Sequence, residues 1–449
     1  MKISRPLIYL LILGLVIRIA ISLFSFQYRE NTDILRWRDW GRIAYLYNLE
    51  DTYKTDHISF GTLPNNMPPG TLYIASGMYM ANNYTNRALL KILAVKEGTF
   101  HWMNSLLPNF FLRIPSIFAD CIIAFLIYKL IKNRSTEKNA IMGMSLFFFN
   151  PVILYNSSLW GQMDSINNLF FLACLFSFFK KRLVFGLIFY ALSLYIKLSL
   201  LFALPFILVI LFKFYKNNIF SFLKSILITI IAILAFTLPI SPNPIAWITK
   251  FLTTNATGEM QNITSFAFNF WWFIFKPTIA MGQPVNNFKF SEIQLINSPL
   301  SQTLFFGISL EIWSYLLFTG LSGILLYFLL KTNFKKVPHD RLFLILSLVA
   351  LTAFMFLPRM HERYMYPMFP LLAIACGIKD KFRIYYYIFS IISLINLYLV
   401  WHPTLPPLLP YMLMTNSSFQ WIISAISVII FFIFFTTTIK YLKYEKNTQ

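Results

Sequence analysis

Long apolar runs alternate with short polar segments along the whole chain. A helix needs about 20 apolar residues to cross the hydrocarbon core of a bilayer, so the pattern predicts about twelve membrane-spanning helices, with a range of about 11–13. Several runs are short enough to be buried or half-penetrating helices instead. The predicted spans cover residues 6–26, 105–131, 140–156, 165–179, 183–196, 198–214, 223–240, 304–330, 342–357, 365–377, 384–400 and 421–439.

The composition agrees with an all-α polytopic integral membrane protein. Hydrophobic residues make up 57% of the chain and charged residues 12%, whereas a soluble domain has a charged fraction of about a quarter. The formal net charge of +21 would suggest nucleic acid in a soluble chain, but here Lys and Arg collect between the apolar runs. We therefore expect a lipid bilayer around the chain, no nucleic-acid partner, and a single transmembrane domain over residues 1–449.

Basic residues concentrate in every second connection: residues 129–138, 180–182, 213–224, 331–341, 379–383 and the tail from 440. Because cytoplasmic loops carry an excess of Lys and Arg, both termini are predicted to be cytoplasmic in a multi-pass protein of the cell membrane. The extracytoplasmic face then receives the long loops 27–104 and 241–302 and the turns 160–164, 358–363 and 401–418. The first run starts like a signal peptide, but Arg18 interrupts it and no cleavage site follows, so it is predicted to be a retained span.

The first extracytoplasmic loop is polar and aromatic-rich, and Asp33 is its acid closest to the preceding span. A carboxylate at that depth can be partly desolvated and can act as a general base toward a sugar or lipid hydroxyl. Its expected supports are the neighbouring Arg36, Arg38 and Trp37. The alternative interpretation is an ordinary interfacial ion pair with Arg36.

The same loop contains Pro68-Pro69-Gly70, which fixes the backbone direction twice and releases it at glycine. This sequence predicts a rigid corner that returns the loop to the membrane. Residues 71–80 beyond it are apolar but too short to cross the bilayer, which predicts an interfacial or re-entrant segment.

The turn Trp160-Gly161-Gln162-Met163-Asp164 places an aromatic ring, an amide and a carboxylate between two spans. Asp164 would stand at the N-terminus of the next span, where the helix dipole alone accounts for an anion. Gln162 has no such explanation. An amide beside a carboxylate can hold sugar hydroxyls, so structural and functional interpretations of this turn stay open.

A late turn, residues 357–364, puts two cations, a histidine and a carboxylate at the outer mouth of two spans. Arg359 and Arg363 are four residues apart and could clamp a phosphate with forked hydrogen bonds, with His361 donating to the same oxygens. Charges near hydrocarbon are expensive and usually functional. The alternative is a compact ion-pair turn in which Glu362 binds one of the arginines.

Two further candidates are less specific. Lys197 lies between two helix ends and could meet a lipid phosphate or extend to water. Asn269-Phe270-Trp271-Trp272 offers stacking faces for a sugar or isoprenoid, although Trp is common at every membrane interface. The histidines of the outer face, His57, His101, His361 and His402, match no metal-binding spacing, so no metal is expected.

Taken in order, these pieces resemble one family, the multi-spanning GT-C glycosyltransferases. Within them they are similar to bacterial and archaeal proteins related to the second mannosyltransferase of GPI-anchor synthesis. The resemblance extends to about Pro370, and two positions depart from it: Asn66 stands where the family has Asp, and Thr71 where it has Tyr. The matching segments are Thr32-Asp33 with Trp37 and Trp40-Gly41, Asn66 to Tyr73, Pro115 to Asp120, Asn150-Pro151, Trp160 to Asp164, Ala267 to Trp271, and Arg359 to Tyr364.

The resemblance implies an inverting transfer of a hexose, first of all mannose, from an undecaprenyl or dolichyl phosphate to a lipid or glycan acceptor. Asp33 would be the catalytic base, and no metal or other cofactor is required because cations meet the departing phosphate. The implied phosphate-binding residues are Arg359, His361, Arg363 and Lys197. The implied sugar- and acceptor-binding residues are Trp37, Asn66, Gln162, Asp164, Asn269, Trp271 and Glu362.

Two other classes of function remain. A lipid-linked sugar flippase or small-solute carrier would place polar groups near the bilayer midplane in interrupted helices. Here the candidate groups other than Arg18 and Lys197 gather on one outer face, which favours surface chemistry. A non-catalytic scaffold for a glycosylation complex would not depend on Asp33.

Overall fold

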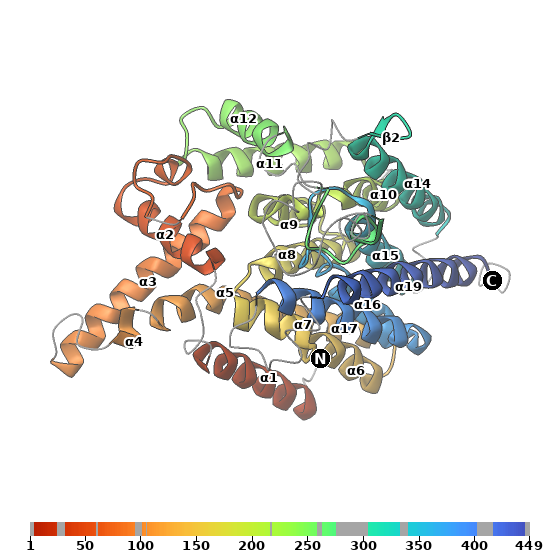
Figure 1. The fold of residues 1–449 in the computed structure, drawn as a ribbon, viewed down its shortest axis with the longest axis horizontal. Helices are drawn as coiled ribbons and strands as arrows, with labels where there is room; N and C mark the ends of the chain where they lie inside the picture. Colours follow the sequence, from red (N-terminus) through yellow and green to blue (C-terminus); the bar gives the residue numbers. More distant parts are fainter. Residues whose placement is uncertain are drawn as a thin grey trace. The chain divides into compact units, whose positions relative to one another are not determined.

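The structure is a computed structural model that describes residues 4–24, 32–59, 62–94, 101–104, 106–215, 218–257, 263–274, 304–332, 340–401 and 416–444. Helices dominate these residues, and the strands among them are two-residue segments (Figure 1). The protein is therefore all-α, as predicted.

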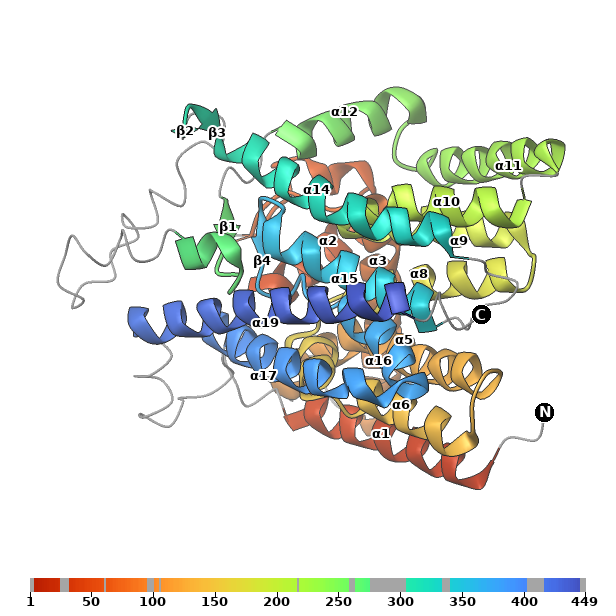
Figure 2. The same cartoon turned by 90° about the vertical axis from the view of Figure 1, so that its right-hand side faces the viewer.

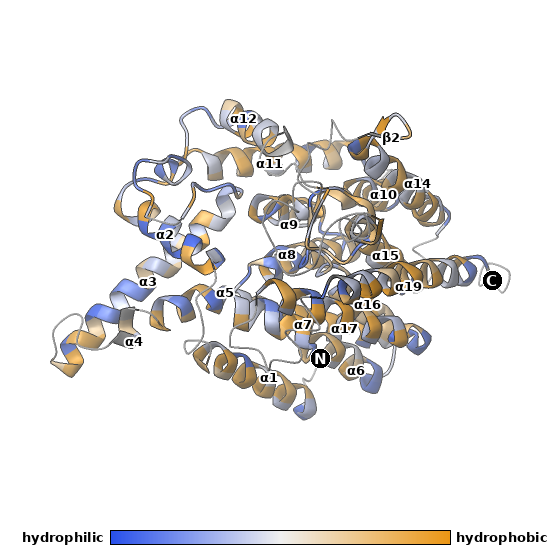
Figure 3. Ribbon diagram, in the orientation of Figure 1, coloured by the Kyte–Doolittle hydropathy of each residue, from blue (hydrophilic) through white to orange (hydrophobic). Residues whose placement is uncertain are grey.

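Seven of the described helices are long and apolar enough to cross a membrane, and an eighth span results if a helix pair bent by 44° counts as one. The seven are Arg5–Phe24, Leu106–Lys132, Leu198–Tyr215, Ile219–Thr237, Leu310–Lys331, Asp380–Val400 and Ser418–Lys443. Figure 3 shows helices α1, α11 and α19 as predominantly hydrophobic ribbons. A multi-pass membrane protein is thus confirmed, whereas twelve spans and the orientation of the termini stay predictions.

The described chain forms two compact units, the first made of residues 1–126, 153–201 and 214–257 and the second of residues 127–152, 202–213 and 258–449. In the first unit α2 packs against α3, and α9 packs against α8, α3 and α11. Its elements are α1 (Arg5–Phe24), α2 (Thr32–Leu46), η2 (Glu50–Tyr53), α3 (Pro69–Leu93), α4 (His101–Asn104), most of α5 (Leu106–Lys132), η3 (Tyr155–Trp160), α8 (Asp164–Phe179), α9 (Leu183–Ile196), α11 (Ile219–Thr237) and α12 (Pro244–Thr257).

The second unit is built around α15 (Asp340–Phe356), a helix buried at every one of its residues. It packs against α14, α16 and α19, and α16 also packs against α6 and α17 (Figure 2). The other elements are α6 (Glu137–Phe148), α7 (Pro151–Leu154), α10 (Leu204–Tyr215), β1 (Thr264–Ser265), β2 (Leu304–Phe305), β3 (Ile308–Ser309), α14 (Leu310–Lys331), β4 (Met360–His361), α16 (Met368–Ile378), η6 (Asp380–Phe382), α17 (Arg383–Val400) and α19 (Ser417–Tyr444), with η4 (Leu198–Ala203) at the boundary of the two units.

The predicted outer loop 27–104, in which interfacial or re-entrant helices are expected, is largely helical in its described part. Pro68-Pro69-Gly70 starts the 25-residue helix α3 with Pro at its first turn instead of forming a corner, a position where the missing N–H of proline costs nothing. The apolar segment 71–80 is thus less than half of a much longer helix. Of the second long loop, residues 258–262 and 275–302 lie outside the described part of the chain.

The predicted span 140–156 is a broken helix. α6 ends at Phe148, and the helix resumes at Pro151 with a bend of 44°. Asn150 holds the break, since its Oδ1 accepts from the amide of Val152 (2.9 Å) and its Nδ2 lies 2.9 Å from both Tyr386 Oη and Ser390 Oγ. Proline cannot continue the hydrogen bonding of α6, which accounts for the break.

Candidate active site

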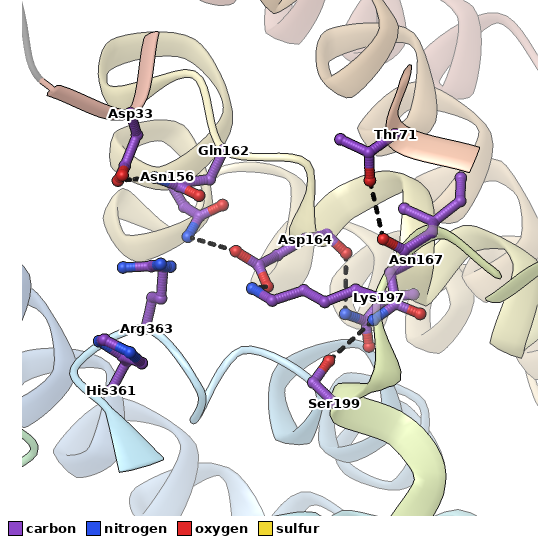
Figure 4. A network of polar contacts seen from close by, with 12 residues as sticks. Asp33, Thr71, Asn156, Gln162, Asp164, Asn167, Lys197, Ser199, His361 and Arg363 are labelled. Atoms are coloured by element: carbon purple, nitrogen blue, oxygen red, sulfur yellow. Dashed lines mark hydrogen bonds and ion pairs between the residues drawn. The ribbon is translucent and has the colours of Figure 1, made fainter. Parts of the chain in front are cut away.

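Asp33 lies in the first turn of α2, and 21% of its side chain is exposed. Its Oδ2 accepts hydrogen bonds from Gln162 Nε2 (2.6 Å; Figure 4) and from Trp160 Nε1 (3.2 Å). Arg36 Nη1 is 3.9 Å from Oδ1. The predicted ion pair with Arg36 is therefore present, and the hydrogen bonds come from Trp160 and Gln162, more than 120 residues away in sequence.

The backbone of that turn is fixed at Gly161, which has φ +84°. The amides of Gly161 and Gln162 both donate to the carbonyl of Asn156, at 3.1 and 2.9 Å. The left-handed backbone favours glycine here, and a Cβ on Gly161 would lie 2.8 Å from Ile34 Cδ1, so that any other residue would also have to displace this side chain of α2. Ser116 Oγ of α5 completes the support by donating to the carbonyl of Gln162 (2.7 Å).

A buried ion pair lies beneath this turn. Arg18 Nε of α1 donates to Asp120 Oδ2 of α5 at 3.0 Å, and both side chains are fully buried. Ser157 Oγ of η3 donates to the same oxygen (2.6 Å). The sequence interpretation gave Arg18 and Asp120 no roles, although an arginine and an acid in two early apolar spans indicate a buried ion pair.

Asp164 and Lys197 form a second buried ion pair, with a distance of 2.5 Å between Oδ1 and Nζ (Figure 4). Asp164 stands in the first turn of α8, as predicted. Lys197 is only 5% exposed, so the alternative in which it extends to water is wrong. Asn156 Nδ2, 3.4 Å from Asp164 Oδ2, connects the pair to the turn that holds Asp33. The predicted contact of Lys197 with a lipid phosphate stays untested.

Further polar side chains surround the open end of α9, where the chain breaks before η4. Asn167 Nδ2 donates to Ser199 Oγ (2.9 Å), and Ser193 Oγ donates to Asn167 Oδ1 (2.5 Å). Thr71 Oγ1 donates to the carbonyl of Ile196 (2.9 Å), one of the helix-end carbonyls that lack an intrahelical partner. Thr71, which departs from the resembled pattern, therefore closes this helix end.

Trp37 and Asn66 lie differently from what a sugar-binding role suggests. Trp37 is 4% exposed and packs in an apolar cluster with Ile34, Leu112 and Met163, so its ring faces are covered. Asn66 is half-buried in the segment before α3. Their predicted contacts with acceptor stay untested.

Asp39, on the same helix as Asp33, has a structural environment. Its carboxylate accepts from the amide and Oγ of Ser59 (2.9 and 2.6 Å), from Thr62 Oγ1 (2.7 Å) and from Arg42 Nη2 (2.8 Å). Burial alone raises the pKa of Asp39, but these hydrogen bonds outweigh it and leave the pKa below its usual value. Asp39 thus anchors the segment that follows α2.

In the second unit the segment 357–367 forms turns and the strand β4, which pairs in parallel with β1. Arg359 has φ +62°, its amide donates to Ile263 O (3.1 Å), and its Nη2 lies 3.3 Å from Glu311 Oε1. Arg359 and Arg363 therefore lie in the predicted turn, and their predicted phosphate clamp stays untested.

Glu362 is 1% exposed and is the centre of its own ion pair. Arg363 Nη1 donates to Oε1 at 2.7 Å, and His361 Nδ1 is 3.6 Å from Oε2. Burial alone raises the pKa of Glu362, but the charge of Arg363 and the bond from His361 lower the pKa to about 2. The ion-pair alternative is thus present, and Figure 4 shows His361 and Arg363 rising from one loop.

Asn269 and Trp271 use their polar atoms within the second unit. Asn269 Nδ2 donates to Phe354 O (3.1 Å), and Trp271 Nε1 donates to Phe356 O (2.8 Å). Both carbonyls belong to the C-terminal end of α15. These contacts account for the two side chains without a ligand, and their predicted stacking against a sugar stays untested.

Among the residues that the structure describes, no group of three or more His, Cys, Asp or Glu side chains could hold a metal ion. His402 lies outside the described part of the chain. The chain matches no protein-family model, and a search of curated proteins finds no match either.

Proposed function

We propose that the protein is an inverting membrane glycosyltransferase that moves a hexose, with mannose as the first choice, from a polyprenyl phosphate to a hydroxyl of a lipid or glycan. The supporting observation is the arrangement of Asp33. One carboxylate oxygen is fixed by Gln162 and Trp160, and Oδ1 makes no hydrogen bond to another described residue. A partly exposed, oriented carboxylate with one oxygen available is what a general base requires.

In the proposed reaction Asp33 Oδ1 takes the proton of the acceptor hydroxyl. The hydroxyl oxygen forms a bond to the anomeric carbon while the bond from that carbon to the phosphate oxygen breaks. The electron pair leaves with the polyprenyl phosphate, and the resemblance to the GT-C glycosyltransferases implies that Arg359, His361 and Arg363 stabilise its charge. Gln162 orients a sugar hydroxyl, and Glu362 holds His361 and Arg363 in place. Asp164 and Lys197 neutralise each other and act chiefly by supporting Asn156 and the turn.

The proposed setting is the cell membrane, with about twelve spans, cytoplasmic termini and the reacting groups at the extracytoplasmic face. The regular alternation of basic connections supports this orientation. The donor then enters laterally from the bilayer with its phosphate at the outer surface.

Asp33→Asn tests the base. Asparagine can still accept from Gln162 and Trp160, so thermal stability should be unchanged, while transfer from polyprenyl-phosphate mannose should fall by at least about a hundredfold. The matched control is Asp39→Asn on the same helix, which should lower thermal stability because it loses charge-assisted bonds from Arg42. Its turnover per folded molecule should stay near that of the wild type.

Full transfer by a folded Asp33→Asn protein would remove Asp33 as the base. Equal loss of activity and stability in both variants would mean that Asp33, like Asp39, has a structural role only. No turnover of any polyprenyl-phosphate hexose by the wild type would contradict the proposed enzyme.

A carrier for lipid-linked sugars is the second candidate. The helix breaks at Asn150 and Lys197, together with the buried Asp164–Lys197 pair, resemble the interrupted helices that carriers use. In reconstituted vesicles a carrier would move the labelled lipid across the bilayer without consuming it.

A further inference from the structure

At one end of the second unit, several apolar helices bring basic side chains together around one tyrosine. α15 begins at Asp340, α16 ends at Ile378, and Tyr441 lies near the end of α19. Lys379 and Lys381 belong to the short connection between α16 and α17. This set, Arg341, Lys379, Lys381 and Tyr441, is called the Tyr441 cluster below.

The cations of the Tyr441 cluster surround the ring closely. Lys381 Nζ lies 3.8 Å from the ring centroid, Lys379 Nζ lies 5.8 Å from it, and Arg341 Cζ lies 6.0 Å from it. All three distances are within the range of cation–π attraction, which extends to about 6 Å. The Tyr441 hydroxyl donates to Asp340 Oδ2 at 2.6 Å, which increases electron density on the ring and strengthens its attraction for cations.

The cluster concentrates positive charge. Residues 340–341 and 379–383 carry four basic and two acidic side chains, and Asp340 is buried against Tyr441. Positive charge gathered this closely attracts an anion. The arrangement therefore fits a ligand with a compact negative charge.

We propose that the Tyr441 cluster binds the phosphate of an anionic phospholipid headgroup. Apolar side chains next to it favour a lipid over a soluble anion: Ile384 and Tyr387, in the first turns of α17, are 56% and 48% exposed. These side chains would contact acyl chains while Lys379, Lys381 and Arg341 hold the phosphate. This binding site is independent of the proposed glycosyl transfer.

The test measures which lipid stays with the protein. The full-length chain is reconstituted in phosphatidylcholine vesicles containing a minority of phosphatidylglycerol and extracted in mild detergent, and the retained lipids are quantified by mass spectrometry. The wild type should be enriched in phosphatidylglycerol, and Lys379→Gln with Lys381→Gln should reduce the enrichment by about tenfold. Lys440→Gln with Lys443→Gln removes the same charge from the end of α19 and should keep the enrichment.

Equal loss in the two double variants would overturn the site, because it would indicate diffuse surface charge. Displacement of phosphatidylglycerol by inorganic phosphate would overturn the lipid as occupant. If Lys379→Gln with Lys381→Gln does not fold, two other variants decide: Lys379→Arg with Lys381→Arg should retain the lipid, and Tyr441→Leu should lose it. Undiminished enrichment in a folded Tyr441→Leu protein would also overturn the proposal.

Discussion

Asp120, Asp164 and Glu362 are each buried against a cation, whereas Asp33 is partly exposed and held by the neutral groups of Gln162 and Trp160. Removing one partner of a buried pair leaves an uncompensated charge and typically costs about 3–5 kcal/mol. Each of the three paired acids therefore stabilises the fold of its own unit. Asp33 is the acid whose surroundings leave it able to meet a substrate.

At the scale of single residues, Gly161→Ala should be more damaging than Gly307→Ala. Both glycines have left-handed backbones, with φ +84° and +76°, so both substitutions incur a strain of about 1–2 kcal/mol. Only at Gly161 would the new Cβ also meet Ile34, at 2.8 Å, since nothing lies within 4 Å of a Cβ on Gly307. Thermal unfolding should show a larger loss for Gly161→Ala.

Transfer activity should separate the same two variants, because displacement of Gln162 would release Asp33. Gly307→Ala should keep the wild-type rate. Identical unfolding temperatures for the two proteins would show that Ile34 moves aside freely and that the turn tolerates a side chain.

Residue types could be predicted from the sequence more readily than their partners. The pattern singled out Asp33, Gln162 and Asp164, since polar groups beside apolar runs are conspicuous. It could not show that Asp164 binds Lys197, 33 residues further on, because nothing local distinguishes this partner from water or a phosphate. Trp37 looked available to a ligand, yet long-range packing buries it.

At the scale of elements, apolar runs predicted helices well, and α9 has the predicted limits of residues 183–196. Helices were expected in the loop 27–104, but the limits of α2 and of the second half of α3 were not predicted, because charged residues lie between their apolar ones. The break at Asn150-Pro151 was also missed, although proline signals it. Composition identifies the helices that are surrounded by lipid. A helix outside the lipid depends on tertiary contacts, which the sequence pattern does not show.

Gly70 and Gly77 provide a matched pair on α3. A Cβ on Gly70 would lie 2.7 Å from the backbone oxygen of Tyr195, while nothing lies within 4 Å of a Cβ on Gly77. Gly70→Ala should push α3 away from α9 and destabilise the protein by about 1–3 kcal/mol. Gly77→Ala should be neutral or stabilising by up to about 1 kcal/mol, because alanine favours a helix interior.

Thermal unfolding of the two variants in the same detergent would measure this contrast. Thr71, beside Gly70, donates to the carbonyl of Ile196 at the end of α9. Gly70→Ala should therefore also weaken this hydrogen bond, which lies next to Lys197. A stabilised Gly70→Ala protein would contradict the close contact between α3 and α9.

At the scale of the whole molecule, the proposed orientation can be tested by labelling single cysteines. The native Cys121, Cys174 and Cys376 are first replaced by alanine, and a cysteine is then introduced at Asp56 or Arg182, both exposed. A membrane-impermeant maleimide should label Asp56→Cys in intact cells and Arg182→Cys only after permeabilisation. The reverse pattern would invert the orientation and place Asp33 in the cytoplasm.

The Arg18–Asp120 pair has a consequence for biogenesis. Asp120 follows Arg18 by 102 residues, so the ribosome delivers α1 to the membrane before the acid exists. Insertion of α1 must then bear the cost of a central arginine, about 2.5–3.5 kcal/mol, from its own apolar residues alone. Insertion of α5 removes that cost, because Asp120 then pairs with Arg18. Packing of α5 against α1 is therefore an early and strongly favoured step of assembly. It also forms the support on which Trp160 and Gln162 later pack.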